Sequence, residues 1–342
     1  MLKSFADVLD IYNGKNQKQV EDIDGVYPIY GSGGIMGYAN DYICPESTVI
    51  IGRKGSINKP IYVTSPLWNV DTAFGLVAKK DILNPKYLYY FCEYFDFERL
   101  NTTVTIPSLT KANLLKIRIK VPELNVQANI VERLDKVKYI IQKCQEELKL
   151  LDNLIKSRFV EMFGEYPANP RRWKVGTIKE VVADVRYGSS RPAVDGGKYP
   201  YLRMNNITYS GELDLTDIKR INVPESELEK CTVRRGDVLF NRTNSKELVG
   251  KTCVYNQDEM MVLAGFVIRV RVNERVLPDF LSTFLNMDFS KKMLSGMCKA
   301  AIGQANINAR EMQNIGIYIP PVELQRQFVQ FKEQTTKLKL AG

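Results

Sequence analysis

The sequence predicts an α+β fold in which two β-rich modules are separated by long helices that form an antiparallel coiled coil. Three observations support this prediction. The chain of 342 residues is long for a single domain, a segment of its first half recurs in its second half at an offset of 198 residues, and residues 125–163 show heptad spacing.

The composition favours an acidic partner and excludes many enzymes. Lysine and arginine outnumber the acidic residues by 48 to 39, and the resulting net charge of +9 favours a partner such as nucleic acid. The chain has no histidine. This absence excludes hydrolases that use a histidine base, and it excludes zinc sites with histidine ligands.

The cysteines and the N-terminus predict an intracellular protein. None of the six cysteines belongs to a CxxC pair, so free thiols in a reducing cytoplasm are expected rather than a zinc knuckle or a disulfide framework. Asp7 and Asp10 interrupt the segment where a secretory signal needs an apolar run, and no apolar run is long enough to cross a membrane. We therefore expect a cytoplasmic location.

The clearest feature is a repeat that aligns without a gap. IRIKVPELNVQANIV (residues 117–131) matches IGIYIPPVELQRQFV (residues 315–329) in its alternating apolar residues, its proline, its glutamine and two apolar residues after it. The alternation predicts a β-strand, and the proline predicts that the strand ends before a helix begins. Each copy is thus expected to place a strand directly before a helix.

Three earlier pairs of segments agree with this repeat when gaps are allowed. FADVLDIYNG resembles IKEVVADVRYG, STVIIGRKG resembles GDVLFNRTN, and NPKYLYYF resembles LPDFLSTF. The second of these pairs aligns Arg53 with Arg242. Two copies of one β-rich module, each leading to a helix, are the simplest explanation.

The helix predicted after the first module has an apolar seam with alternating spacings of four and three residues, which is typical of a coiled coil. It is expected to run from about Asn125 to Phe163, because Gly164 and Pro167 end it. Such a helix spans about 58 Å and is predicted to act as a spacer. The residues expected to form the scaffold are Ile130, Leu134, Val137, Ile141, Leu148, Leu151 and Ile155.

A shorter helix of about 17 residues is predicted after the second module, with Phe328 and Leu338 in its seam. Paired antiparallel with the longer helix, it covers only about 25 Å of it. The first four seam residues of the longer helix would then lack a partner within the chain. An apolar stripe of this kind usually marks an interface.

These elements divide the chain into four predicted segments. They are a first module at residues 1–121, a central helix at 122–165, a second module at 166–319 and a distal helix at 320–342. The central helix carries 7 basic and 8 acidic residues, whereas the second module carries 23 and 17. The basic excess therefore lies in the modules, as expected if the modules bind nucleic acid and the helix separates them.

Motifs that would indicate catalysis are incomplete. GSGGIMG (residues 31–37) departs from the dinucleotide-binding pattern at Met36, and SKELVGKT (residues 245–252) has Ser245 where a phosphate-binding loop has its first glycine. NPKY and NPRR lack the second proline of an amino-methyltransferase loop. We therefore predict no catalytic residue, no metal site and no cofactor in this chain.

Polar and basic residues instead gather in loops between apolar strands, a composition that suits contacts with phosphates and base edges. IGRKGSINKPIYV in the first module and FNRTNSKELVGK in the second share it, and YGSSRP and YLRMNN add to it. The recurrence in both modules favours nucleic-acid binding over ordinary solvated loops. The residues predicted to contact DNA are Arg53, Lys54, Ser56, Asn58, Lys59, Arg191, Arg203, Asn205, Arg242, Asn244, Ser245 and Lys246.

The chain resembles the specificity subunits of type I restriction-modification systems. The resemblance lies in the paired segments VPELNVQANIV and IPPVELQRQFV, in the heptads between the two modules, and in loops such as GRKGSINKP and DVLFNRTNS. It covers nearly the whole chain. The distal helix departs from the family's pattern, because it is much shorter than the central helix.

This resemblance implies a non-catalytic subunit in which each target-recognition domain reads one half of a split site in double-stranded DNA through the major groove. The two helical regions would pack antiparallel as a ruler and dock methyltransferase subunits that carry S-adenosylmethionine. A restriction subunit that uses ATP and Mg would join them. No cofactor is then expected in this chain itself.

Other interpretations remain open from the sequence. The chain could be the recognition subunit of a related restriction system whose partner combines methylation and cleavage, or it could associate with a second copy of itself through the coil. It could also be a coiled-coil scaffold without DNA specificity, or a stand-alone nuclease. Salt-dependent, sequence-selective DNA binding would separate the recognition subunits from the scaffold, and metal-dependent cutting would indicate a nuclease.

Overall fold

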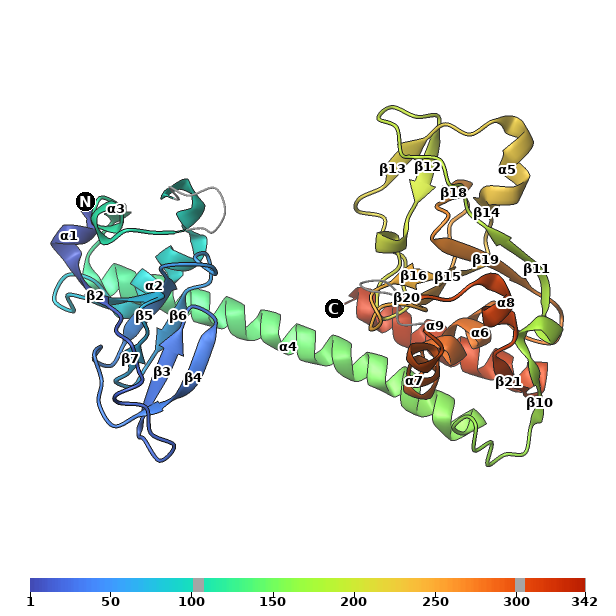
Figure 1. Ribbon diagram of the computed structural model, residues 1–342, viewed down its shortest axis with the longest axis horizontal. Coiled ribbons are helices and arrows are strands. Elements are labelled where there is room, and N and C mark those ends of the chain that lie inside the picture. The colour runs from blue at the N-terminus through green and yellow to red at the C-terminus, as the bar shows by residue number, and fades with distance from the viewer. Residues whose placement is uncertain (101–107, 299–304, 342) are drawn as a thin grey trace. The chain divides into compact units, whose positions relative to one another are not determined.

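The computed structural model describes residues 1–100, 108–298 and 305–341 (Figure 1). The chain forms two compact units, Met1–Lys143 and Cys144–Gly342, and their boundary falls inside one long helix. The division into four segments therefore stays a prediction. Residues 101–107, 299–304 and 342 of those segments lie outside the described residues.

The first unit is built from short strands with a few helices. Strand β5 is buried along its whole length, which explains its continuous apolar sequence. Helix α2 begins with Pro85, and the Asn84 side chain caps it by accepting hydrogen bonds from two backbone N–H groups. The elements are β1 (Leu2–Ser4), α1 (Phe5–Val8), β2 (Leu9–Asn13), β3 (Tyr27–Gly31), β4 (Gly34–Ala39), β5 (Thr48–Gly52), β6 (Ile61–Val63), β7 (Trp68–Asn69), β8 (Ala73–Ala78), α2 (Pro85–Tyr94), η1 (Phe97–Leu100), α3 (Lys111–Leu115), β9 (Arg118–Lys120) and the first part of α4 (Leu124–Phe163).

The second unit contains the rest of α4 and a larger set of strands and helices. Helix α6 also begins with a proline, Pro278, and Asn308 caps helix α8. The elements after α4 are β10 (Lys174–Thr177), η2 (Ile178–Val181), β11 (Val182–Tyr187), β12 (Tyr199–Leu202), η3 (Met204–Asn206), β13 (Lys219–Ile221), α5 (Glu225–Cys231), β14 (Thr232–Val233), β15 (Val238–Asn241), β16 (Thr243–Asn244), β17 (Thr252–Val254), β18 (Met261–Leu263), β19 (Val267–Val272), α6 (Pro278–Asn286), α7 (Asp288–Met297), β20 (Ala305–Asn306), α8 (Ala309–Gln313), β21 (Gly316–Ile319) and α9 (Val322–Ala341).

The two units repeat one sheet topology. The first contains a four-stranded antiparallel sheet of order β2-β8-β5-β6 and a three-stranded sheet of order β4-β3-β7. The second repeats the former as β11-β19-β15-β17 and has the four-stranded sheet β13-β12-β18-β14 in place of the latter, with β14 as an additional strand. The sheets β4-β3-β7 and β13-β12-β18-β14 each contain one parallel pair, β3 with β7 and β12 with β18. The strand before each long helix, β9 or β21, pairs with the first strand of its module, β1 or β10. The repeat predicted from the sequence is confirmed as a structural duplication.

A buried glutamine joins the start of α4 to the rest of the first module. The Gln127 Nε2 donates hydrogen bonds to the carbonyl oxygens of Ile82, at 2.9 Å, and Pro122, at 2.8 Å. Its Oε1 accepts a hydrogen bond from the Asn84 N–H at 2.8 Å. One side chain therefore connects the end of the β9 segment, the loop before α2 and the long helix.

Gln325 repeats this arrangement at the start of α9. Its Nε2 donates to the carbonyl oxygens of Arg275 and Pro320 at 3.1 and 2.8 Å, and its Oε1 accepts from the Leu277 N–H at 2.8 Å. Both glutamines are fully buried. The glutamine that stood out in the sequence repeat thus closes the same junction in both modules.

Helix α9 packs antiparallel along the C-terminal part of α4 within the second unit (Figure 1). The ring of Phe328, early in α9, lies 5.2 Å from that of Phe159 and 5.7 Å from that of Phe163, late in α4. Lys339, late in α9, pairs with Asp152, which comes earlier in α4. The antiparallel helix pair is therefore confirmed, with 20 residues in α9 against 40 in α4.

The buried face of α4 differs from the predicted seam near its C-terminal end. The buried residues are Ile155, Phe159 and Phe163, each four residues from the next. The heptad pattern predicts Arg158 and Met162 after Ile155, and both are only partly buried. Because α4 here packs on a globular core that includes α6 as well as α9, it follows the period of a straight helix and not that of a supercoil.

We predict that Gln325→Ala lowers the free energy of unfolding of the second unit by about 1–3 kcal/mol. The substitution leaves the partly buried Leu277 N–H, the partly buried Arg275 carbonyl and the buried Pro320 carbonyl without their partner. Urea unfolding followed by circular dichroism measures the change. Gln327→Ala on the exposed face of α9 is the matched control and should change stability by less than about 0.5 kcal/mol. Equal effects of the two substitutions would contradict the junction role.

Candidate nucleic-acid interface

Loops of the first unit meet at one end of its four-stranded sheet, where β2 and β5 end and β8 begins. Arg53 follows β5, and its backbone N–H donates to the Thr72 carbonyl at 2.8 Å while its own carbonyl accepts from the Leu109 N–H at 2.9 Å. The glycine-rich turn after β3 adjoins this loop, because a Cβ on Gly52 would lie 3.1 Å from the Ser32 Cβ. The glycine-rich motif therefore belongs to this loop end.

The second unit builds the same loop end from equivalent strands. Arg242 follows β15, its N–H donates to the Phe266 carbonyl at 3.0 Å, and its carbonyl accepts from the Ile307 N–H at 2.9 Å. Arg53 and Arg242 thus occupy equivalent backbone positions, each held by two hydrogen bonds. The alignment of these two arginines in the sequence is confirmed.

A glycine beside each arginine loop is required by its surroundings. A Cβ on Gly14, after β2, would lie 1.8 Å from the Val70 carbonyl oxygen, and a Cβ on Gly188, after β11, would lie 2.3 Å from the Ala264 carbonyl oxygen. Only glycine allows the backbones to approach so closely. The same close approach therefore shapes both loop ends.

The candidate residues of the first module are mostly exposed. Arg53, Lys54, Ser56 and Lys59 lie at the surface, and no ion pair involves their side chains within the described part of the chain. The Arg53 guanidinium lies 5.7 Å from the centre of an aromatic ring, that of Phe74 in β8. These cationic groups are available to a polyanion.

Asn58, predicted to contact DNA, has intramolecular partners in the structure. Its Oδ1 accepts a hydrogen bond from the Phe97 N–H at 2.8 Å, and its Nδ2 donates to an Asp96 carboxylate oxygen at 3.1 Å. This side chain therefore holds the loop against η1. It could contact a ligand only by giving up these bonds.

Two predicted arginines of the second module are paired with carboxylates. Arg191 binds both carboxylate oxygens of Glu227, at 2.7 and 3.2 Å, and Arg203 binds Asp217 at 2.8 Å. The Arg191 guanidinium beside Glu227 lowers the pKa of that carboxyl. Asn205 is exposed. Contacts of the two arginines with DNA would compete with their existing ion pairs.

The loop after Arg242 contains the other candidates of the second module. Asn244 is partly buried, and its Oδ1 accepts a hydrogen bond from the Ser245 N–H at 2.9 Å. Ser245 is also partly buried. Lys246 is exposed, and in the described ranges no ion pair involves it. Lys246 is therefore the free cation of this loop.

Three residues of this loop end were missed by the sequence reasoning. The ring centre of Tyr187 lies 5.1 Å from the Arg242 guanidinium, and the Asn306 Oδ1 accepts a hydrogen bond from Arg242 Nη2 at 3.0 Å. Phe266, whose carbonyl binds the Arg242 N–H, has an exposed ring. Their positions beside Arg242 depend on the strand register and on the loop connections, for which the sequence gives no local signal.

The predicted scaffold residues differ in exposure along α4. Ile155 and, in α9, Phe328 are buried, and Ile130 and Leu151 are partly buried. The remaining predicted seam residues are exposed, namely Leu134, Val137, Ile141, Leu148 and Leu338. The part of α4 before Leu148 therefore presents an apolar stripe to solvent.

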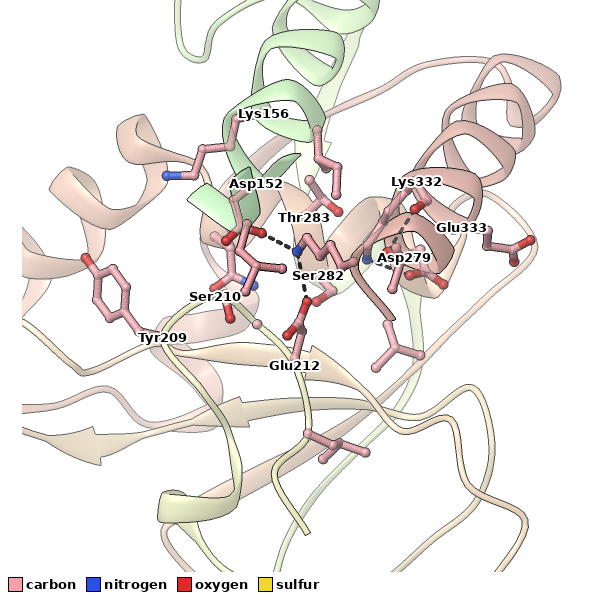
Figure 2. A pocket seen from close by; sticks show the side chains of 18 of the residues that line it. Asp152, Lys156, Tyr209, Ser210, Glu212, Asp279, Ser282, Thr283, Lys332 and Glu333 are labelled. Atoms are coloured by element: carbon pink, nitrogen blue, oxygen red, sulfur yellow. Dashed lines mark hydrogen bonds and ion pairs between the residues drawn. The ribbon is translucent and has the colours of Figure 1, made fainter. Parts of the chain in front are cut away.

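A cavity of about 920 Å³ lies in the second unit between α4, α6, α9 and the loop at residues 209–215 (Figure 2). Charged side chains from these elements pair across it. Lys339 binds Asp152 of α4 and, at 3.0 Å, Glu212 of the loop, and Lys332 binds Asp279 of α6 at 2.7 Å. These ion pairs thus connect α9 to α4, to α6 and to the loop.

Lys291 of α7 also lines this cavity, in an environment that disfavours the charged form of its amine. Its Nζ donates a hydrogen bond to the Gly250 carbonyl at 2.6 Å. Burial, together with the nearby charges of Lys156 and Lys251, lowers the pKa of Lys291 to about 7. This amine is therefore partly neutral near physiological pH.

Residues 1–100, 108–298 and 305–341 contain neither a membrane-spanning helix nor a cluster of metal ligands. No helix there is long and apolar enough to span a membrane. No group of three or more histidine, cysteine, aspartate and glutamate side chains there could hold a metal ion.

Two copies of a β-rich module, each with an arginine-bearing loop end and each followed by a helix, define a protein with paired recognition domains. The chain belongs to the family described as type I restriction modification DNA specificity domain, whose model matches residues 1–150 and 170–340.

Curated relatives and solved structures agree with this assignment. The chain is 24% identical over 321 residues to the EcoKI type I restriction enzyme specificity subunit of Escherichia coli K12, covering 85% of this chain and 68% of the relative. It is 21% identical over 324 residues to the EcoBI specificity subunit of Escherichia coli, covering 86% and 67%. The chain thus spans about two thirds of the length of these relatives.

The structural comparisons support the same fold. The S subunit of a type I restriction-modification system from M. genitalium matches with a TM-score of 0.56 and 15% identity, covering 100% of this chain and 92% of that one. A structure concerning complex assembly of the type I R-M system matches with a TM-score of 0.55 and 16% identity, with the same coverage.

We predict that Lys291→Met changes the pH dependence of stability. The folded-state pKa near 7 lies below the usual value of 10.5, so the unfolded chain binds more protons than the folded chain between these values. The contribution of Lys291 to the free energy of unfolding therefore rises with pH above about 7, and methionine removes this rise. Urea unfolding at about pH 7 and about pH 8.5 measures it.

The matched control for this experiment is Lys292→Met, which changes the neighbouring exposed lysine. Methionine at position 291 should stabilise the protein more at the lower pH, and the control should show no such difference. An equal effect of Lys291→Met at both pH values would show that the amine is not desolvated.

Proposed function

We propose that this chain is the DNA-recognition subunit of a type I restriction-modification complex, in which each module reads one half of a bipartite site. The observation that carries the proposal is the equivalent placement of Arg53 and Arg242 at the loop ends of duplicated modules. An arginine at a fixed backbone position suits bidentate contacts with guanine or phosphate. Two such positions suit two half-sites.

The distribution of charge supports a polyanionic ligand at the modules. The second module carries 23 basic and 17 acidic residues, whereas the central helical segment carries 7 and 8. Contacts with phosphates supply affinity that is independent of sequence, and contacts with base edges supply selectivity. The exposed cations at both loop ends fit the first role, and the two equivalent arginines fit the second.

The helices are proposed to set the spacing between the half-sites and to dock methyltransferase subunits. Support comes from the exposed apolar stripe of α4, formed by Leu134, Val137 and Ile141. Soluble proteins rarely leave such a stripe in water without a partner. A methyltransferase subunit is the proposed cover, and a second copy of this chain is the other possible one.

In this proposal the chain holds no cofactor and performs no catalytic step. Methyl transfer with S-adenosylmethionine belongs to methyltransferase subunits, and cleavage with ATP and Mg belongs to restriction subunits. The names of the relatives, specificity subunits of type I restriction enzymes, support this division of labour. The complex is proposed to work in the cytoplasm.

The first test of this function exchanges residues 1–121 for the corresponding module of another family member. We expect the methylated sequence to change in one half only, because each module carries its own loop end. Sequencing of methylated bases in cells with the parent and exchanged genes measures this. A change in both halves together, or in the spacer, would contradict independent reading by the modules.

The second test concerns the exposed stripe of α4. Leu134→Asp and Ile141→Asp are expected to weaken assembly with the methyltransferase subunit at least about tenfold, because a buried leucine or isoleucine contributes about 1.5–3 kcal/mol. Light scattering of the chain, alone and with its partner, measures assembly. Asn129→Asp, which adds the same charge to an exposed position of α4, is the control. Assembly that ignores both stripe substitutions would show that the stripe is not the docking surface.

A further inference from the structure

Phe266 carries an exposed aromatic ring on the loop whose backbone binds the arginine of the second module. Its side chain is 52% exposed. The loop that carries it is nevertheless fixed, because the Gly265 N–H donates to the Ser189 carbonyl at 2.7 Å and the Phe266 carbonyl accepts from the Arg242 N–H at 3.0 Å. Such a ring on a fixed loop offers an apolar contact surface at a defined position.

The Arg242 guanidinium has a defined orientation. It lies 5.1 Å from the centre of the Tyr187 ring, and its Nη2 donates to the Asn306 Oδ1 at 3.0 Å. The Tyr187 ring is itself held, since its hydroxyl accepts a hydrogen bond from the Ala309 N–H at 2.8 Å. The guanidinium retains N–H groups on Nη1 and Nη2 beyond the one bonded to Asn306. A bidentate acceptor can therefore bind without reorienting it.

We propose that the second module reads a guanine with Arg242 and, in the adjacent base pair, the methyl group of a thymine with Phe266. This inference rests on the proposed function as a DNA-recognition subunit. In the major groove, arginine binds guanine O6 and N7 with two hydrogen bonds, and phenylalanine can contact the thymine methyl group. Adjacent bases are about 3.4 Å apart along the helix axis. Arg242 and Phe266 are joined by a backbone hydrogen bond of 3.0 Å, a spacing that suits adjacent pairs.

The first module has different residues at the equivalent positions. Thr72 replaces Phe266 as the residue whose carbonyl binds the arginine N–H, and Asn13 replaces Tyr187 at the end of the edge strand. Arg53 instead lies 5.7 Å from the ring of Phe74. The guanine–thymine reading is therefore assigned to the second module alone.

The experiment uses the full chain assembled with its methyltransferase subunit. A pool of DNA duplexes with randomised positions is selected by the parent complex and by the Arg53→Ala and Arg242→Ala complexes. The half of the selected sequence in which the Arg242→Ala complex loses base selectivity is the half read by the second module. Its guanines are then replaced by 7-deazaguanine, which lacks the N7 acceptor, and its thymines by deoxyuridine, which lacks the methyl group.

The expected results differ between the two contacts. Replacement of one guanine by 7-deazaguanine weakens binding of the parent complex about 5- to 150-fold and has little effect on the Arg242→Ala complex. Deoxyuridine in the adjacent pair weakens binding of the parent about fourfold and has no effect on the Phe266→Ala complex. Thr72→Ala, the matched change in the first module, leaves both effects in place.

The binding penalty caused by 7-deazaguanine also tests whether Tyr187 positions the Arg242 guanidinium. Tyr187→Ala removes the ring beside the guanidinium, so the penalty for 7-deazaguanine should shrink. Tyr187→Phe keeps the ring and should restore most of that penalty. An unchanged penalty in Tyr187→Ala would contradict this positioning role.

Other outcomes separate failure of this inference from failure of the proposed function. If the parent complex enriches no sequence, the proposed function itself is wrong. If a sequence is enriched but 7-deazaguanine has no effect in the second half, DNA recognition stands and the guanine contact is wrong. If Phe266→Ala remains sensitive to deoxyuridine, or weakens binding to all duplexes alike, the thymine contact is wrong.

Discussion

Each module depends on one buried amide side chain. Gln127 and Gln325 each use two donors and one acceptor to bind three backbone groups, which come from the end of a strand and from the loop before a helix. Glutamate has no donor, and asparagine is one methylene shorter, so neither can make the same three bonds at this place. Since unbonded buried backbone groups are costly, this side chain fixes how each long helix leaves its module.

The two loop ends combine one backbone arrangement with different side chains, which suits the proposed reading of two different half-sites. The loop ends of the two modules share their close backbone approach at Gly14 and Gly188 and the two hydrogen bonds that hold the arginine. The neighbours of that arginine differ, with Thr72 in the first module and Phe266 in the second. Selectivity in a groove depends on side chains, whereas their reach depends on the backbone. The two modules thus share the backbone framework and differ in the side chains beside the arginine, which the proposed function assigns to DNA reading.

Much of the fold could be predicted from the sequence because it depends on local signals. The spacing of apolar residues, the proline and the glycine gave α4 almost to the residue, and the repeat aligned Arg53 with Arg242. The partners of the candidate site could not be predicted in the same way. The pairing of Arg191 with Glu227 joins residues 36 positions apart, and the exposure of Phe266 depends on how β18 and β19 are joined. The prediction of the seam after Ile155 was wrong for a related reason, since the core on which α4 packs is built by distant segments.

Arg53 and Arg242 differ in the side-chain entropy that each would lose on binding a ligand. Ordering a free arginine side chain costs about 2 kcal/mol of rotamer entropy. Arg242 has already lost part of this freedom, because Tyr187 and Asn306 hold its guanidinium, whereas Arg53 is exposed over a single ring. Preorganisation lowers the entropic cost of forming a bidentate contact and raises the penalty for a ligand that fits poorly. In the proposed function, the second module would therefore read its base more strictly at this position, whereas the first module could adapt its arginine to more than one base.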